Sequence, residues 1–120
     1  MGRRAKPNGF PRHYRLNSPR DYRRALGRRA RRIQSGPLRI FAVRNTMSGA
    51  RLGLIVGKRA VRRAHDRNRL KRSAREAFRQ CRAGLPAIDV VLHVQGPIHH
   101  RELRRRLEEA LEQMSDPTSG

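Results

Sequence analysis

Seventeen residues, RAHDRNRLKRSAREAFR (63–79), combine closely spaced cations with apolar residues at regular intervals. The apolar residues recur every three or four positions, as on a helix with one side in a core; they are Leu70, Ala74, Ala77, Phe78 and Cys81. At about 100° per residue the opposite side is mainly cationic; it carries Asn68, Lys71, Arg72, Arg75, Arg79 and Arg82. The stretch therefore predicts a helix, capped by Asp66 or Asn68, that is anchored by its apolar side and presents positive charge outward.

Segments typical of strands lie on both sides of this helix. Residues 38–44 (LRIFAVR), 51–57 (RLGLIVG) and 88–95 (IDVVLHVQ) are rich in β-branched and other apolar residues, and NTMSG (45–49) forms a turn between the first two. Gly53 and Gly57 share one face of the second segment, which indicates either close approach of another backbone or a ligand, or a bulge. Gly84 and Pro86 end the central helix before the third strand.

Two further helices are predicted. In the first, Ser18 is the expected N-cap and Pro19 the first helical residue, and the region ends at Gly36-Pro37 at the latest. The last helix follows Gly96-Pro97. The apolar positions are Tyr22, Leu26 and Ile33 in the first helical region and Leu103, Leu107, Ala110, Leu111 and Met114 in the last.

The order of helix, strands, helix, strand and helix predicts the α+β class, as a single-domain α–β sandwich with helices packed on a small sheet. Residues 15–114 are expected to form this one domain. Residues 1–14 contain two prolines and two glycines among basic residues, so we expect a mobile basic arm. Residues 115–120 are expected to form a flexible tail.

The charge is extreme and unevenly placed. The 120 residues include 30 basic and 9 acidic side chains, a net charge of +21, and 27 of the basic residues are arginine. Residues 1–32 hold twelve basic side chains and one acidic, and residues 58–82 hold eleven and two, whereas residues 101–113 hold four of each. Because such repulsion opposes compaction, a polyanionic partner is expected. Nucleic acid is the first candidate and an anionic membrane surface the second.

Arginine suits phosphate because its planar guanidinium is permanently charged and donates several hydrogen bonds. Aromatic residues that could stack on bases are few, and the candidates are Tyr14, Tyr22 and Phe41. Tyr22 falls on an apolar helical side, so core packing is an equally good interpretation of this residue.

Signals for membranes or secretion are not visible in the sequence. No run of about 18 apolar residues could span a bilayer, and the N-terminal residues lack the apolar stretch of a secretory signal. Cys81 is the single cysteine, which excludes an internal disulfide. We therefore expect a cytoplasmic protein.

Residue patterns for catalysis or metal binding are scarce. Asp89 is isolated in the sequence, and the glutamates at 108, 109 and 112 are expected to pair with arginines on their own helix. His99 and His100 are expected to point apart, and no cysteine spacing supports a zinc site. Cys81 is interpreted as a small core residue. We predict no catalytic residue and no metal site in this chain.

The segment RNRLKRSAREAFR (67–79) closely resembles the signature of bacterial ribonuclease P protein components, small basic subunits that act with a catalytic RNA. The resemblance extends over residues 51–79 and LPAIDVVLHV (85–94), and RLNSPRDYRRAL (15–26) is similar to the family's first helix. It implies a mixed four-stranded sheet, with a fourth strand near residues 33–37. It also implies a left-handed crossover through the 67–82 helix, against the usual right-handed rule.

The resemblance also implies functional positions. The residues that would contact the RNA subunit, near the metal ions at the cleavage site, are Arg67, Asn68, Arg69 and Arg72, with the basic pair Lys58 and Arg59. The cleft for the single-stranded leader maps onto Tyr22, Leu26, Lys71 and Arg75. Leu26 stands where the family usually has an aromatic residue, so apolar packing would replace stacking there.

The implied function is that of the ribonuclease P protein subunit, which assists endonucleolytic removal of the 5′ leader from precursor tRNA. It would bind the leader and the RNA subunit and improve substrate and metal affinity, while the catalytic centre and most of the Mg²⁺ would belong to the RNA. The implied partners are ribonuclease P catalytic RNA and precursor tRNA, with one protein per RNA and neither DNA nor membrane.

Two other functions remain as alternatives. Composition alone fits a structural RNA-binding protein, such as a ribosomal component or an RNA chaperone, equally well. A DNA-binding protein that uses the 67–82 helix in a major groove is disfavoured, because predicted strands flank that helix where a helix-turn-helix protein needs a second helix.

Overall fold

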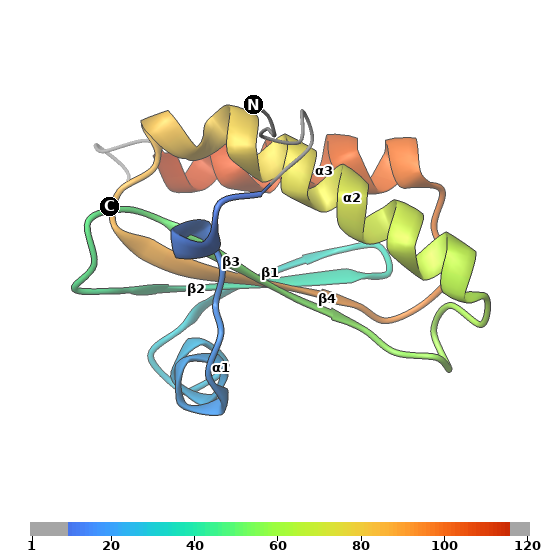
Figure 1. The fold of residues 1–120 in the computed structure, drawn as a ribbon, viewed down its shortest axis with the longest axis horizontal. Helices are drawn as coiled ribbons and strands as arrows, with labels where there is room; N and C mark the ends of the chain where they lie inside the picture. Colours follow the sequence, from blue (N-terminus) through green and yellow to red (C-terminus); the bar gives the residue numbers. More distant parts are fainter. Residues whose placement is uncertain (1–9, 116–120) are drawn as a thin grey trace, which may run out of the picture.

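The computed structural model describes residues 10–115. Its elements are η1 (Arg12–Tyr14), α1 (Pro19–Ala25), β1 (Arg31–Ser35), β2 (Leu38–Arg44), β3 (Arg51–Val56), α2 (Ala64–Cys81), η2 (Arg82–Gly84), β4 (Ile88–Val94) and α3 (His100–Ser115). The strands form one sheet in the order β1-β2-β4-β3, in which only β3 and β4 are parallel. Helices α2 and α3 cover one face of the sheet and α1 lies against the other (Figure 1). The predicted α+β class and mixed four-stranded sheet are confirmed.

Helix α2 connects the two parallel strands, and its apolar side is buried as predicted. The residues on that side are at most 3 % exposed and join the main core between the helices and the sheet; they are Leu70, Ala74, Ala77 and Phe78. The helix begins at Ala64 after Arg63 as N-cap, so the prediction that Asp66 or Asn68 caps it is wrong. Asp66 lies in the first turn instead, where the helix dipole favours a carboxylate. The left-handed crossover stays a prediction.

Helix α1 is shorter than the apolar spacing predicts. Ser18 caps it as expected, since its Oγ accepts a hydrogen bond from the Asp21 N–H at 3.1 Å, but the helix ends at Ala25. Ile33, which we expected on the helical side, lies in β1 opposite Ile40 of β2 and packs on the main core. Strand pairing has therefore overridden a local helical periodicity.

The fourth strand, β1, lies two residues earlier than the expected 33–37. Ser35 pairs with Leu38, which leaves a two-residue turn of Gly36 and Pro37. Gly36 has a φ of 57°, a conformation that favours glycine at the first central position of a tight hairpin turn. Gly36 and Pro37, which we expected to end a helical region, therefore form the turn of the hairpin between β1 and β2.

The N-terminal segment is folded from Phe10 onward. Phe10 is 8 % exposed, and its ring centroid lies 5.5 Å from that of Tyr14 and 6.0 Å from that of Phe78 on α2. The prediction of a mobile arm that ends at residue 14 is therefore wrong for residues 10–14. Residues 1–9 of that arm and residues 116–120 of the expected tail lie outside the described residues.

Helix α3 carries the expected pairs of opposite charge. Arg104 bonds Glu108 at 3.1 Å, and Arg106 bonds Glu102 at 2.8 Å. At its N-terminus, the rings of His99 and His100 stack with centroids 4.5 Å apart, so the expectation that they point apart is wrong. Among the described residues, no helix is both long and apolar enough to cross a membrane.

A buried carboxylate joins several of these elements. Asp89 of β4 is 0 % exposed and accepts two hydrogen bonds of 2.9 Å from Arg51 of β3. It also accepts 2.7 Å hydrogen bonds from Arg24 of α1 and from Asn45 in the turn after β2. Burial by itself would raise the pKa of Asp89, but the hydrogen bonds from Arg51, Asn45 and Arg24 prevail and leave it lowered.

We predict that Asp89→Asn destabilises the protein by about 3 kcal/mol at pH 7, because it leaves Arg51 with too little compensating charge in a buried position. Since the pKa of Asp89 is lowered by folding, its contribution is complete above the unfolded carboxyl pKa of about 3.9 and is lost as the pH falls through the folded value. We therefore expect the free energy of unfolding in urea to fall less between pH 7 and pH 3 for Asp89→Asn than for the wild type. The exposed carboxylate variant Asp66→Asn is the control, and an equal effect in both variants would contradict the prediction.

Candidate nucleic-acid interface

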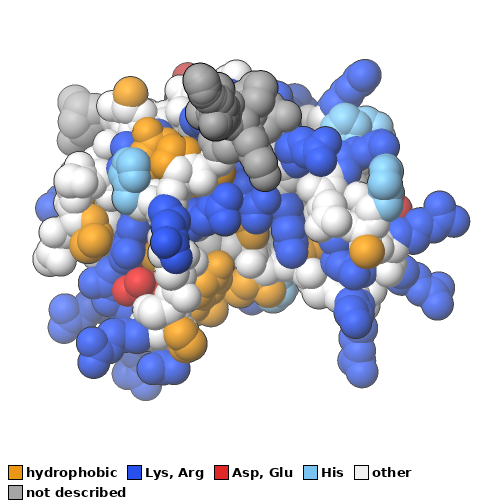
Figure 2. Space-filling view, in the orientation of Figure 1, with side chains coloured by type: hydrophobic (Ala, Val, Ile, Leu, Met, Phe, Trp, Pro, Cys, Tyr) orange, Lys and Arg blue, Asp and Glu red, His pale blue; other side chains and the backbone are white. Residues whose placement is uncertain are grey.

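Cations without an acidic partner gather around α1 and α2. In the described part of the chain, the salt bridges engage arginines of α3, the arginines around Asp89 and Arg79 of α2, but not Lys71, Arg72 or Arg75 of α2. Figure 2 shows basic side chains over much of this face, with few acidic ones between them. Positive charge that the fold leaves unneutralised is available for phosphate.

The side chains of Arg67, Asn68 and Arg69, at the start of α2, point to different surroundings. The Arg67 guanidinium donates hydrogen bonds of 2.9 Å to the carbonyls of Val61 and Arg62, so it fixes the loop that leads into the helix. Asn68 lies on the outer side of α2. Arg69 lies near His100 at the start of α3, where loss of solvent first, and then the charges of His99 and Arg69, lower the pKa of His100. The triplet therefore does not form a single patch.

Asn68 belongs to a row of side chains that runs along α2, which we call the α2 ridge. The ridge consists of Asn68, Arg72, Arg75 and Arg79, which line one surface pocket with Phe10 and Glu76. Arg79 forms a 2.9 Å salt bridge with Glu76. Within residues 10–115, the other two arginines of the ridge, Arg72 and Arg75, have no acidic partner. The ridge presents these guanidinium groups to solvent on the side opposite the buried stripe.

A second pocket, which we call the cleft, lies between α2 and the segment that leads into α1. It has a volume of about 210 Å³ and is lined by Phe10, Arg15, Leu16, Asn17, Tyr22, Leu52, Leu54, Lys71 and Arg75. Three of the four leader-cleft residues predicted from the sequence are thus brought together here, from α1 and α2. The fourth, Leu26, does not line this pocket and packs instead on the second apolar cluster, with Ala25, Phe41 and Val91.

Tyr22 is held in the cleft by the edge of the sheet. Its hydroxyl accepts a hydrogen bond from the Leu54 N–H at 3.2 Å, and a Cβ added to Gly53 would lie 2.8 Å from the ring. Gly53 therefore permits a close approach, but by a side chain of this chain and not by the backbone, ligand or bulge that we expected, and a Cβ at Gly57 would meet nothing within 4 Å. The Leu16 N–H bonds the Leu52 carbonyl at 3.0 Å next to it, so the exposed edge of β3 is covered.

The cations of the cleft repel one another. Burial, together with the positive charge of Arg15, lowers the pKa of Arg75. An anion in the cleft would relieve this repulsion, and Lys71 lies beside the same space. The arrangement therefore favours binding of a phosphate group that enters between α1 and α2.

The predicted pair Lys58 and Arg59 lies apart from the cleft, in the exposed loop between β3 and α2. Arg59 lines a shallow surface pocket with Arg62 and Arg63 of the same loop. This loop and the start of α2 form one basic end of the molecule, because Arg67 holds the loop against the helix.

Groups for acid–base or metal chemistry are not brought together. Among residues 10–115, no three His, Cys, Asp or Glu side chains are grouped so that they could hold a metal ion. The Asp89 carboxylate is occupied by two arginines. Burial, followed by the nearby Glu108 and Glu112, raises the pKa of the half-buried Cys81 thiol, which favours its neutral form.

Sequence reasoning missed the contribution of the N-terminal segment to both pockets. Phe10 lines the ridge pocket and the cleft, and Arg15 adds a cation to the cleft. Arg82, which we expected on the outer side of α2, instead places its guanidinium 3.8 Å from the Tyr14 ring centroid and bonds the Ala50 carbonyl. The signal that could have found this segment is the pair Phe10 and Tyr14, whose aromatic rings are poorly suited to a solvated arm.

The sequence is similar to known ribonuclease P proteins along most of its length. The family model for Ribonuclease P matches residues 10–116. The chain is 36 % identical over 116 residues to the ribonuclease P protein component of Thioalkalivibrio sulfidiphilus, with 94 % of this chain and 96 % of the relative covered. It is 38 % identical over 105 residues to that of Salmonella arizonae, with 88 % and 87 % covered.

Solved structures show the same fold. The RNase P protein of Staphylococcus aureus superimposes with a TM-score of 0.76 at 22 % identity, over 86 % of this chain and 98 % of that one. The RNase P protein of Thermotoga maritima gives a TM-score of 0.69 at 25 % identity, over 82 % and 96 %.

We predict that Gly53→Ala destabilises the protein by about 1–3 kcal/mol, because the new methyl group overpacks the Tyr22 ring and the Leu16 side chain. Gly57→Ala, directly after the same strand, is the matched control, since a Cβ there meets nothing within 4 Å. Urea unfolding measures stability, and tyrosine fluorescence in a Tyr14→Phe background reports on the Tyr22 ring. Equal stability of the two variants would show that the ring does not require glycine beneath it.

Proposed function

Because this chain belongs to the bacterial ribonuclease P protein family, the accessory subunits of the ribonucleoprotein that processes precursor tRNA, we propose that its cleft binds the single-stranded 5′ leader. As a member, it associates with ribonuclease P RNA and the tRNA substrate. The observation that carries the proposal is the meeting of Tyr22, Lys71 and Arg75 around one pocket. These side chains offer an aromatic surface and two cations, which suit a base and its phosphates.

The cleft is better suited to a single-stranded leader than to a nucleic-acid duplex. The pocket is about 210 Å³, which suits single nucleotides, and its aromatic ring is fixed in place by the Leu54 N–H and by contact with Gly53. Preorganisation of this kind lowers the entropy that binding loses. We infer that the cleft contacts bases by stacking and apolar packing and contacts phosphates through Lys71, Arg75 and Arg15.

The ridge and the basic loop are proposed as the contact with the RNA subunit. Asn68 and Arg72 of the ridge are exposed, and the ridge adjoins the cleft through Arg75, which lines both pockets. Lys58 and Arg59 are exposed in the loop before the start of α2. Arg67 acts there by holding the loop in place. Arg69 is proposed as a contact on the neighbouring side of α2, so the RNA subunit would wrap around the start of that helix.

The chemistry is proposed to reside in the RNA subunit. The described residues offer no carboxylate cluster for Mg²⁺, so the proposal gives this chain no metal ligand and no step of bond cleavage. The chain would hold the leader and reduce repulsion between phosphates, so that the RNA subunit binds its substrate and its magnesium more tightly. We further propose one protein per RNA, a cytoplasmic location with the precursor tRNA, and no DNA or membrane partner.

We predict that adding this chain to a bacterial ribonuclease P RNA restores leader cleavage at a magnesium concentration at which the RNA alone is inactive. The reason is that bound cations replace part of the screening that magnesium provides. Gel analysis of cleaved precursor tRNA measures the rescue. A structural RNA-binding protein or RNA chaperone would bind the RNA without restoring cleavage, and that outcome would exclude the proposal.

We predict that Lys71→Ala with Arg75→Ala weakens holoenzyme binding of precursor tRNA about tenfold, because two phosphate contacts are lost, and leaves mature tRNA binding nearly unchanged. Filter binding with both tRNAs measures the effect. The matched control is Arg101→Ala with Arg105→Ala, which removes the same charge from the outer side of α3. Equal losses of affinity for precursor and mature tRNA would contradict the proposal that the cleft binds the leader.

A further inference from the structure

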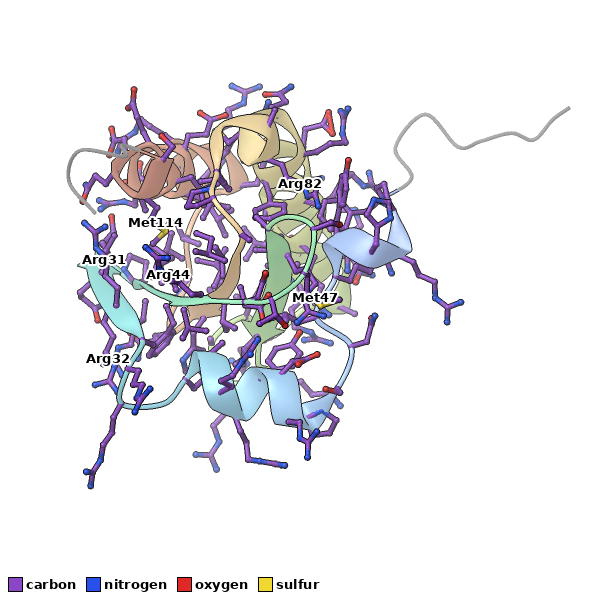
Figure 3. All side chains as sticks on the ribbon, turned by 90° about the vertical axis from the view of Figure 1, so that its left-hand side faces the viewer. Arg31, Arg32, Arg44, Met47, Arg82 and Met114 are labelled. Atoms are coloured by element: carbon purple, nitrogen blue, oxygen red, sulfur yellow. The ribbon has the colours of Figure 1, made fainter. Side chains whose placement is uncertain are left out.

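A second basic cavity lies at the opposite end of α1 from the cleft. We call it the end groove; it has a volume of about 820 Å³ and is lined by Arg24, Gly27, Arg28, Arg29, Arg31, Ala42, Val43, Arg44, Pro86, Ile88 and Met114. Figure 3 looks at this end of the molecule and shows Arg31 and Arg44 beside Met114, between α3 above and α1 below. No residue of the end groove is among those that we predicted from the sequence to bind RNA.

The rim of the end groove is unneutralised. Its exposed arginines 28, 29, 31 and 44 take part in no salt bridge within residues 10–115, and only Arg24 has an acidic partner, Asp89. By contrast, three of the four arginines of α3, Arg104, Arg105 and Arg106, are paired with glutamates. Four like charges around one cavity repel one another, and a chain of phosphates would relieve that repulsion.

The floor of the end groove is apolar. Ala42, Ile88 and Met114 are 7–8 % exposed, and the half-buried Val43 and the exposed Pro86 complete the surface. A thioether and aliphatic groups can pack against the face of a base, and a guanidinium can stack on it while bonding phosphate. The combination of an apolar floor with a guanidinium rim suits unpaired nucleotides, which expose both base faces and phosphates, better than it suits a duplex, whose bases are stacked.

The position of α1 connects the end groove to the cleft. Tyr22 of α1 lines the cleft and Arg24, two residues later, lines the end groove. The helix is seven residues long, or about 10 Å, which about three stacked nucleotides would cover. Arg20 and Arg23 are exposed on the same helix and take part in no salt bridge within residues 10–115, so a strand that follows α1 meets further cations there.

We propose that the end groove binds the 5′-distal nucleotides of the leader, those that extend beyond the cleft. This inference rests on the proposed function of the cleft and extends it to a second site on the same strand. Nucleotides next to the cleavage site occupy the cleft, and the strand then passes along α1 into the end groove. Long leaders therefore gain affinity that short leaders do not.

The test uses the reconstituted holoenzyme and two precursors of the same tRNA. One carries a short leader of about four nucleotides, which reaches only the cleft, and the other a leader of about twelve nucleotides in an unstructured sequence. The variant Arg28→Ala with Arg29→Ala removes two rim cations without touching the Asp89 hydrogen bonds. The control is again Arg101→Ala with Arg105→Ala, and thermal unfolding of each free protein shows that it is folded.

We expect the end-groove variant to bind the long-leader precursor about fivefold more weakly and the short-leader precursor unchanged. The slope of log K against log salt should fall by about 1.4 for the long leader alone, since each single-strand phosphate contact contributes about 0.7. A loss that is equal for both leaders, or weaker binding of the RNA subunit itself, would assign the end groove to the RNA subunit and overturn the proposal. No change in either affinity would overturn it as well.

Failure of this inference is distinguishable from failure of the cleft. Suppose that Lys71→Ala with Arg75→Ala weakens binding of the short-leader precursor, while the end-groove variant changes the affinity for neither precursor. The cleft then remains assigned to the leader, and the end groove is excluded as a leader site. A single 4-thiouridine placed in the distal leader gives an independent measurement. It should crosslink to a peptide that contains residues 27–31, and crosslinks only to the RNA subunit would contradict the proposal.

Discussion

The carboxylate of Asp89 is the interaction on which the arrangement of this molecule depends. It joins β4 to β3 through Arg51, to α1 through Arg24, and to the turn after β2 through Asn45. In a chain with a net charge of +21, a buried anion with two cationic partners offsets part of the repulsion within the fold. Because α1 separates the cleft from the end groove, the position fixed through Arg24 decides the geometry of both cavities.

The few acidic residues are distributed so that positive charge remains where RNA is expected. Glu102, Glu108 and Glu109 pair with arginines of α3, which makes that helix a nearly neutral support on the outer side of the core. Helix α2 packs against α3 and the sheet with an apolar stripe and keeps Lys71 and Arg72 without salt bridges in the described part of the chain. The division explains how one small fold can be cohesive and still attract a polyanion.

The cleft shows how a structural contact can also prepare a binding surface. The Tyr22 ring rests on Gly53 and its hydroxyl occupies the Leu54 N–H at the edge of β3, so its orientation is fixed before any ligand arrives. The same contacts protect a strand edge that could otherwise pair with another chain. Core packing and ligand stacking, which the sequence left as alternatives for this residue, are therefore compatible.

Strong periodicity in the sequence was sufficient to predict the buried stripe of α2, the apolar side of α3 and the three main strands, and the signature in α2 was sufficient to identify the family. The sequence could not determine where α1 ends, because Ile33 continues a helical spacing by chance and only pairing with β2 makes it part of a strand. Nor could it assign partners to Asp89, which come from 38, 44 and 65 residues away. Local spacing shows which side of an element is apolar. The meeting of Tyr22 with Lys71, the burial of Phe10 and the arginines around the end groove depend instead on how distant elements pack, and this packing is visible in the folded molecule alone.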